Sequence, residues 1–222
     1  MRKPLVACVL IGSFCVTSLA QMVAAPAAPT TQPKAHDFAK WEKEISAYEA
    51  ADKTSPPPKG GLVFTGSSTI RRWATMADDL KGYQVLNRGF GGSEILDATH
   101  FADRIIFPYE PKMVLIRAGG NDIHNGKSPE AVFADFQEFV ATIHSRLPNA
   151  QIVYISQGPS IARITETEKQ KTLNDMVLGM LAKTPYVKYI ETFDLPLGPD
   201  GKPRADLFVE DKLHFNAEGN RL

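Results

Sequence analysis

The sequence predicts an α/β fold in which a mostly parallel sheet is covered by helices on both faces. Short apolar runs alternate with longer amphipathic stretches from residue 62 onward, and no internal repeat interrupts the alternation. Parallel strands need long crossover connections, usually helices, so this order of elements is typical of a parallel sheet. The five expected strands cover residues 62–65, 84–86, 113–117, 152–156 and 187–190, and the expected helices lie near 69–80, 94–106, 129–147 and 165–183.

A further helix is predicted ahead of the first strand. Phe38, Trp41, Ile45 and Tyr48 recur at steps of three and four residues, with charged residues between them. This is the pattern of an amphipathic helix that packs on a core, which we favour over an aromatic ligand-binding face. The run Pro-Pro-Pro-Lys-Gly-Gly at 56–61 then ends the helix.

The first 35 residues have the composition of a leader and a tether. Arg2 and Lys3 precede an apolar run at 5–20, which predicts a signal peptide over residues 1–20, and the Pro/Ala-rich stretch 21–35 predicts an extended tether. Cleavage after Ala20 would remove Cys8 and Cys15 and leave no thiol. We therefore expect a bacterial protein that is exported to the periplasm or secreted. Lipidation at Cys8 is the less favoured alternative, because the apolar region before it is too short.

Charge and histidine spacing exclude several classes of function. The chain has 25 basic and 25 acidic residues and no long run of either sign, so it lacks the electrostatic footprint of a nucleic-acid-binding protein. His36, His100, His124 and His144 are scattered, without the helical pairing of a zinc site. We expect no metal, no nucleic acid and no stable membrane span, and a monomer or a weak oligomer.

Small polar and glycine-rich clusters follow three expected strands. They are Gly-Ser-Ser at 66–68, Gly-Phe-Gly-Gly-Ser at 89–93 and Gly-Gly-Asn-Asp at 119–122, and near the end of the chain Asp211 precedes His214 by three residues. Each cluster alone is more often an ordinary turn. Together, at strand ends where α/β sheets place their sites, they supply a hydroxyl nucleophile, a histidine with an orienting carboxylate, and oxyanion donors. This combination indicates acyl transfer.

These blocks resemble the SGNH/GDSL hydrolase family of serine esterases and lipases over about residues 60–221. The resemblance implies a three-layer α/β/α, flavodoxin-like fold with a five-stranded sheet, and no metal or organic cofactor. It implies that Ser68 is the nucleophile and that Asp211 and His214 complete the catalytic set. The amides of Ser68 and Gly92 and the side chain of Asn121 would form the oxyanion hole.

The sequence departs from the family pattern at two places. Ser67 replaces the aspartate of the name-giving motif, which leaves some ambiguity between Ser67 and Ser68 as the nucleophile. The chain stops eight residues after His214, where related chains continue into a helix. We expect residues 36–222 to form a hydrolase domain that lacks its C-terminal helix.

The expected activity is hydrolysis of carboxylic esters through an acyl-enzyme on Ser68. The small polar loop at 119–126 and the lack of a long apolar lid favour short acyl groups, such as acetyl on carbohydrate or small molecules. Lysophospholipase, thioesterase and aryl esterase activities stay open, because the resemblance permits them all. A non-catalytic envelope binding module is the alternative of a different class.

Overall fold

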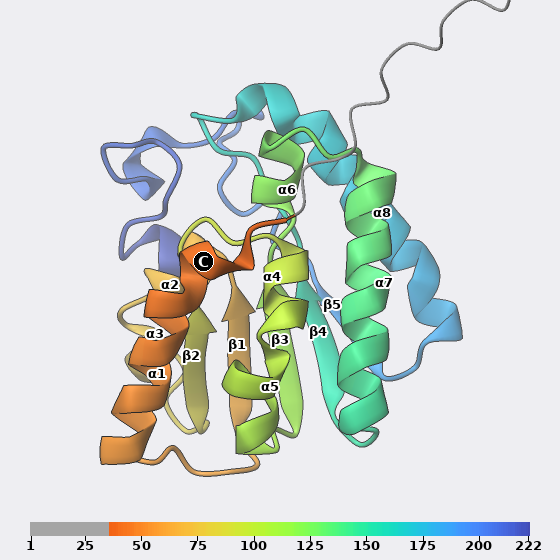
Figure 1. The fold of residues 1–222 in the computed structure, drawn as a ribbon. Coiled ribbons are helices and arrows are strands. Elements are labelled where there is room, and N and C mark those ends of the chain that lie inside the picture. The colour runs from red at the N-terminus through yellow and green to blue at the C-terminus, as the bar shows by residue number, and fades with distance from the viewer. Residues whose placement is uncertain (1–35) are drawn as a thin grey trace, which may run out of the picture. The chain divides into compact units, whose positions relative to one another are not determined.

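The computed structural model describes residues 36–222, and the predicted signal peptide and tether lie outside the described residues. A five-stranded parallel sheet with the strand order β2-β1-β3-β4-β5 forms the centre of the domain (Figure 1). The strands are β1 (Leu62–Gly66), β2 (Val85–Gly89), β3 (Met113–Arg117), β4 (Gln151–Ile155) and β5 (Val187–Ile190). The predicted α/β fold and its five strands are confirmed.

The register of the sheet places the carboxyl ends of its central strands side by side. Gly66 at the end of β1 lies opposite Gly89 of β2 and Arg117 of β3. The segments that leave these strands therefore begin at one edge of the sheet, which is where parallel α/β sheets build their sites.

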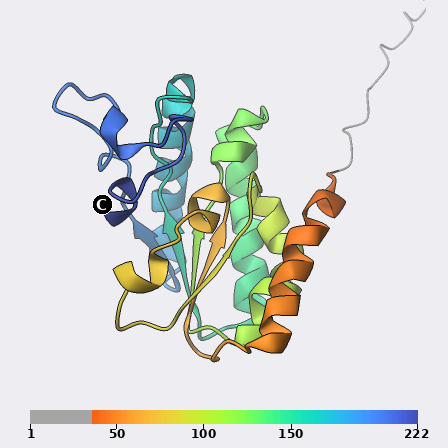
Figure 2. The same ribbon diagram turned by 90° about the vertical axis from the view of Figure 1, so that its left-hand side faces the viewer.

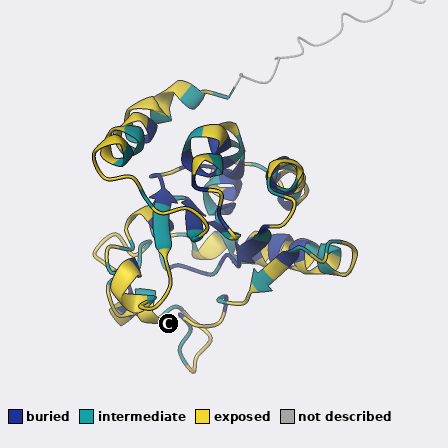
Figure 3. Ribbon diagram, turned by 90° about the horizontal axis from the view of Figure 1, so that it is seen from below, coloured by how far each residue is buried: buried dark blue, intermediate teal, exposed yellow. Residues whose placement is uncertain are grey.

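One face of the sheet is covered by five helices. They are α1 (Glu42–Thr54), α4 (Ile95–His100), α5 (Ala102–Ile105), α7 (Pro129–Arg146) and α8 (Thr167–Met180). Their apolar residues join those of the strands in one large core, in which Ile45, Phe136 and Ile152 are fully buried. Buried residues line the inner surfaces of these helices, and exposed residues lie outward (Figure 3).

The opposite face is covered by much less structure. A smaller core that includes Phe64, Ile70, Met76 and Leu115 lies there under two one-turn helices, α2 (Ser68–Arg71) and α3 (Met76–Asp79). Figure 2 shows α3 on one side of the sheet and α1 on the other. The expected lack of a C-terminal helix stays a prediction.

Several expected helices are interrupted. The helix expected at 69–80 is divided into α2 and α3, because Trp73 Nε1 and Thr75 Oγ1 both donate to Asp79 Oδ2, at 2.7 and 2.5 Å, and form a local turn instead of continuing the helix. The helix expected at 94–106 is divided into α4 and α5 at Phe101. The remaining short elements are α6 (Gly120–His124) and the 3-10 helices η1 (Phe38–Trp41), η2 (Phe107–Tyr109), η3 (Ile164–Glu166), η4 (Leu181–Lys183), η5 (Ala205–Leu207) and η6 (Gly219–Arg221).

Candidate active site

Ser68 lies at the carboxyl edge of the sheet because β1 ends in a turn that only glycine allows. Gly66 has a φ of 118°, and a Cβ on it would lie 2.3 Å from the carbonyl oxygen of Arg117. The Ser67 amide donates to that same carbonyl oxygen at 3.2 Å, and Ser68 then begins α2. The turn thus presents the Ser68 side chain beyond the end of the strand.

A continuous chain of hydrogen bonds connects Ser68, His214 and Asp211. His214 Nε2 lies 2.7 Å from Ser68 Oγ, and His214 Nδ1 lies 2.7 Å from Asp211 Oδ2. An ionised carboxylate can only accept, so Nδ1 carries the proton and Nε2 accepts from the serine hydroxyl. The structure therefore pairs the histidine with Ser68 and not with the neighbouring Ser67.

The Asp211 carboxylate is fixed by its own turn. Its Oδ1 accepts from the backbone amides of Leu213 and His214, both at 2.9 Å, and Arg72 Nη1 lies 3.1 Å from Oδ2. Burial raises the pKa of Asp211, but the amides of His214 and Leu213 and the imidazole together outweigh it and hold the pKa well below its usual range. The carboxylate is therefore ionised at neutral pH and aligned with the imidazole.

Asn121 lies in the same cleft as Ser68 and His214. It belongs to α6, which follows β3, and its Nδ2 donates to the carbonyl oxygen of Ser93 at 3.0 Å. The backbone amide of Ser68 has no acceptor among the described residues. Both groups therefore have an N–H left for a ligand oxygen in the cleft.

Gly92 is the predicted site residue that the structure does not bring into contact with the others. It is exposed, in the loop after β2, and is not among the described residues that line the cleft around Ser68. Its φ of 73° requires glycine, and a Cβ on it would lie 3.3 Å from the Trp41 ring. Its neighbour Ser93 donates to the carbonyl oxygen of Gly66 at 3.1 Å, which ties this loop to the serine turn. The oxyanion role of Gly92 stays a prediction.

Some charged residues around the site were not assigned from the sequence. Asp122, next to Asn121, is fully buried, and burial raises its pKa to about 6 against the opposing charge of Lys127. Its Oδ1 accepts from the Ile95 amide at 3.2 Å. Arg163 donates to Asn121 from 42 positions away. The spacing of residues along the sequence gives no signal for contacts between such distant positions.

Arg117 ends the otherwise apolar strand β3. It donates from Nε to the Ser156 carbonyl oxygen at 3.4 Å, and its guanidinium lies 5.6 Å from the centre of the Phe215 ring. Burial lowers the pKa of Arg117 to about 10.

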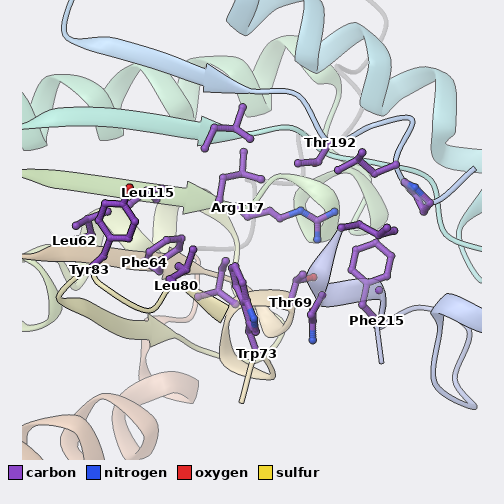
Figure 4. A pocket seen from close by; sticks show the side chains of 18 of the residues that line it. Leu62, Phe64, Thr69, Trp73, Leu80, Tyr83, Leu115, Arg117, Thr192 and Phe215 are labelled. Carbon is purple, nitrogen blue, oxygen red and sulfur yellow. The ribbon is translucent and has the colours of Figure 1, made fainter. Parts of the chain in front are cut away.

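Two cavities meet beside Ser68. The cleft that contains Ser68, Asn121 and His214 is small, about 50 Å³, and mostly polar side chains line it. An apolar groove of about 520 Å³ runs along the thinly covered face of the sheet, past Phe64, Trp73 and Leu115 (Figure 4). Thr69, Arg117 and Phe215 line both cavities.

Within residues 36–222, no group of three or more His, Cys, Asp or Glu side chains is placed to hold a metal ion. In the same range no helix combines the length and apolar character needed to cross a bilayer.

The sequence profile of the GDSL-like Lipase/Acylhydrolase family matches residues 55–222. No curated protein matches the chain. Among solved structures, one described as a platelet activating factor from Streptococcus pneumonia is similar with a TM-score of 0.73 and 16% identity, covering 83% of this chain and 89% of that one.

Two other similar structures are a GDSL-like lipase and an esterase. The GDSL-like lipase from Bacteroides thetaiotaomicron has a TM-score of 0.64 and 16% identity, covering 83% of this chain and 93% of that one. The acetyl xylan esterase AlAXEase has a TM-score of 0.57 and 21% identity, covering 72% and 93%. At these identities the structures establish a common fold, while the profile match covers most of the chain. The chain therefore belongs to the GDSL-like lipase/acylhydrolase family, a family of hydrolases that act on ester bonds.

Proposed function

We propose that this protein is a serine esterase that removes short acyl groups, such as acetyl, from carbohydrate or small-molecule esters. The observation that carries the proposal is the hydrogen-bonded chain of Ser68, His214 and Asp211, which opens on a cleft of only about 50 Å³. The acetyl xylan esterase with the same fold makes acetylated xylan a reasonable first carbohydrate substrate.

The first half of the reaction forms an acyl-enzyme. His214 Nε2 takes the proton of the Ser68 hydroxyl while Ser68 Oγ attacks the ester carbonyl carbon. The negative charge that develops on the carbonyl oxygen is stabilised by the Ser68 amide and the Asn121 side chain, with the Gly92 amide as the third predicted donor. The tetrahedral intermediate then expels the alcohol, which receives its proton from His214.

Water completes the cycle. His214 takes a proton from the water, the hydroxide attacks the acyl carbon, and the serine oxygen leaves with the proton that His214 returns. Asp211 accepts from Nδ1 throughout, so it stabilises the imidazolium that exists between these proton transfers. The acid is released and the enzyme returns to its starting state.

Replacing Ser68 tests the proposal directly. Hydrolysis of p-nitrophenyl acetate should fall by several orders of magnitude in Ser68→Ala, because the nucleophile is lost. Ser67→Ala is the matched control and should retain turnover, since His214 hydrogen-bonds Ser68 and not Ser67. A phosphonate probe should label the parent protein and not Ser68→Ala. Absence of both turnover and labelling in the folded parent protein would favour the binding module.

Hydrolysis of longer acyl esters, such as those of lysophospholipids, is the second candidate. The observation that favours it is the apolar groove, which shares Thr69, Arg117 and Phe215 with the cleft. If the groove held the acyl chain, turnover would rise with acyl length, because each added methylene group would move from water into the apolar groove. Our proposal requires the opposite trend.

A further inference from the structure

Arg163 is a charged residue of the cleft that the mechanism above does not use. It lies between β4 and η3 and is half-buried. Its Nη1 donates to Asn121 Oδ1 at 3.0 Å and to the carbonyl oxygen of Gly120 at 3.2 Å. Arg163, which follows β4, therefore holds the side-chain amide of Asn121, which follows β3.

The contact determines which way the Asn121 amide faces. Arginine has only hydrogen-bond donors, so the atom beside its guanidinium must be Oδ1, and Nδ2 faces the other way. One Nδ2 hydrogen is used by the Ser93 carbonyl oxygen, at 3.0 Å. The other has no acceptor among the described residues and remains for a ligand oxygen.

The charge of Arg163 also strengthens this donor. A cation at the amide oxygen draws electron density from the amide nitrogen, and hydrogen bonds in such a chain polarise one another. The Nδ2 hydrogen opposite Arg163 thus becomes a better partner for a developing oxyanion than an isolated asparagine would offer.

The segment that carries Arg163 is attached to both halves of the site. The Ala162 amide donates to the carbonyl oxygen of Lys212 at 3.1 Å, in the turn between Asp211 and His214. Glu166 Oε1 lies 2.6 Å from His124 Nδ1 at the end of α6. Arg163 is therefore held by neighbours that are fixed to the histidine turn on one side and to α6 on the other.

We propose that Arg163 is a positioning residue of the esterase: it orients and polarises the Asn121 amide as an oxyanion donor. The inference rests on the proposed function, because it needs an oxyanion at Ser68. Because Arg163 acts through Asn121 in this proposal, its removal should lower kcat and leave KM nearly unchanged.

A double-mutant cycle tests this. On p-nitrophenyl acetate, Asn121→Ala should lower kcat by about a hundred- to a thousandfold, as for other oxyanion donors. Arg163→Ala should lower kcat by roughly ten- to a hundredfold, the range of a charge-assisted hydrogen bond. In the Asn121→Ala background the Arg163→Ala change should have little further effect, because its target is already absent.

The controls separate this role from a structural one. Millimolar guanidinium should restore part of the kcat of Arg163→Ala and none of Asn121→Ala, and sodium chloride at equal ionic strength should restore neither. Arg146→Ala, which removes an exposed arginine 3.1 Å from Asp103, should keep the parent kcat. If Arg163→Ala does not fold, the same cycle is run with Arg163→Lys, which retains a cation but loses the planar fork.

Three outcomes would overturn the inference: multiplicative losses in the double variant, an effect confined to KM, or equal rescue of both single variants. These outcomes leave the esterase itself intact as long as Ser68→Ala remains inactive. Full turnover in Ser68→Ala would instead refute the proposed function.

Discussion

Two aspartates beside the cleft show how the local environment determines the behaviour of one residue type. Asp211, whose side chain is 41% exposed, accepts from two backbone amides and an imidazole, and its pKa lies below the usual range. Asp122 is fully buried, and burial raises its pKa to about 6. Asp211 therefore keeps its charge at the pH of most assays, whereas Asp122, with a pKa of about 6, gains a proton in mildly acidic solution while the protein is folded.

Replacing Asp122 should change how stability depends on pH. Its pKa rises from 3.8 to about 6 on folding, so between these values the native state binds more protons than the unfolded state. The free energy of unfolding contributed by this group therefore falls as pH rises through that window. Asp122→Asn removes the effect, so its stability relative to the parent should increase by about 2 kcal/mol between pH 4 and pH 7.

Urea unfolding of both proteins at pH 4, 5, 6 and 7 measures this difference. Asp103→Asn, which changes a surface carboxylate that is 70% exposed, is the control for replacing a carboxylate that is not buried. A constant difference between Asp122→Asn and the parent would show that Lys127, 3.5 Å away, keeps Asp122 ionised throughout.

At the scale of elements, α1 and η1 support the glycine loop that follows β2. The Trp41 ring lies 5.7 Å from the Phe90 ring in an edge-to-face arrangement. Tyr48 donates a hydrogen bond to the Gly89 carbonyl oxygen. Glu44 Oε1 accepts from the Gly91 amide at 3.5 Å. The aromatic stripe predicted from the sequence is therefore a packing face, and what it packs against includes the loop that contains Gly92.

Truncating the buried centre of this helix should destabilise the domain. Ile45 is completely buried in the main core, so Ile45→Ala should lower the free energy of unfolding by about 2–5 kcal/mol through lost burial and a residual cavity. Lys43→Ala, on the exposed side of α1, should change it by no more than about 0.5 kcal/mol. Denaturant unfolding measures both, and equal small effects would mean that α1 does not contribute to the cooperative core.

At the scale of the whole molecule, the two faces of the sheet are unequally covered. Five helices form the large core on one face, while α2 and α3 leave an apolar groove of about 520 Å³ on the other. Ile190 of the edge strand β5 lines this groove and is 43% exposed. The groove and the polar cleft offer an ester two very different surroundings next to Ser68.

Acyl length should show which surroundings the substrate uses. We expect turnover of p-nitrophenyl esters to fall from acetate to octanoate, because the small cleft cannot hold a long chain. Ile190→Glu, which places a charge in the groove, should then affect turnover no more than Leu178→Glu, a matched change at a residue of α8 that is 42% exposed and outside the groove. A selective loss of octanoate turnover in Ile190→Glu would instead assign the acyl chain to the groove.

Much of the fold follows from local pattern. Apolar runs with helices between them predict the five parallel strands, because side-chain periodicity reports directly which face of an element is buried. Local pattern failed where side chains intervened, as between α2 and α3, where Trp73 and Thr75 donate to Asp79 and the expected helix is interrupted. The strands at 113–117 and 187–190 have the predicted bounds, and the ends of the other three strands differ from prediction by one to three residues.

The sequence by itself determined the family and the order of strands and helices along the chain. It also gave the candidates Ser68, Asn121, Asp211 and His214, because these residues lie in short motifs with recognisable neighbours. Only the tertiary structure decided that His214 contacts Ser68 across 146 positions and that Arg163 holds Asn121 across 42. It also decided that Asp122 is buried. The physical reason is that such contacts and burials depend on how distant segments pack, and a linear pattern of residue types carries no distance between them.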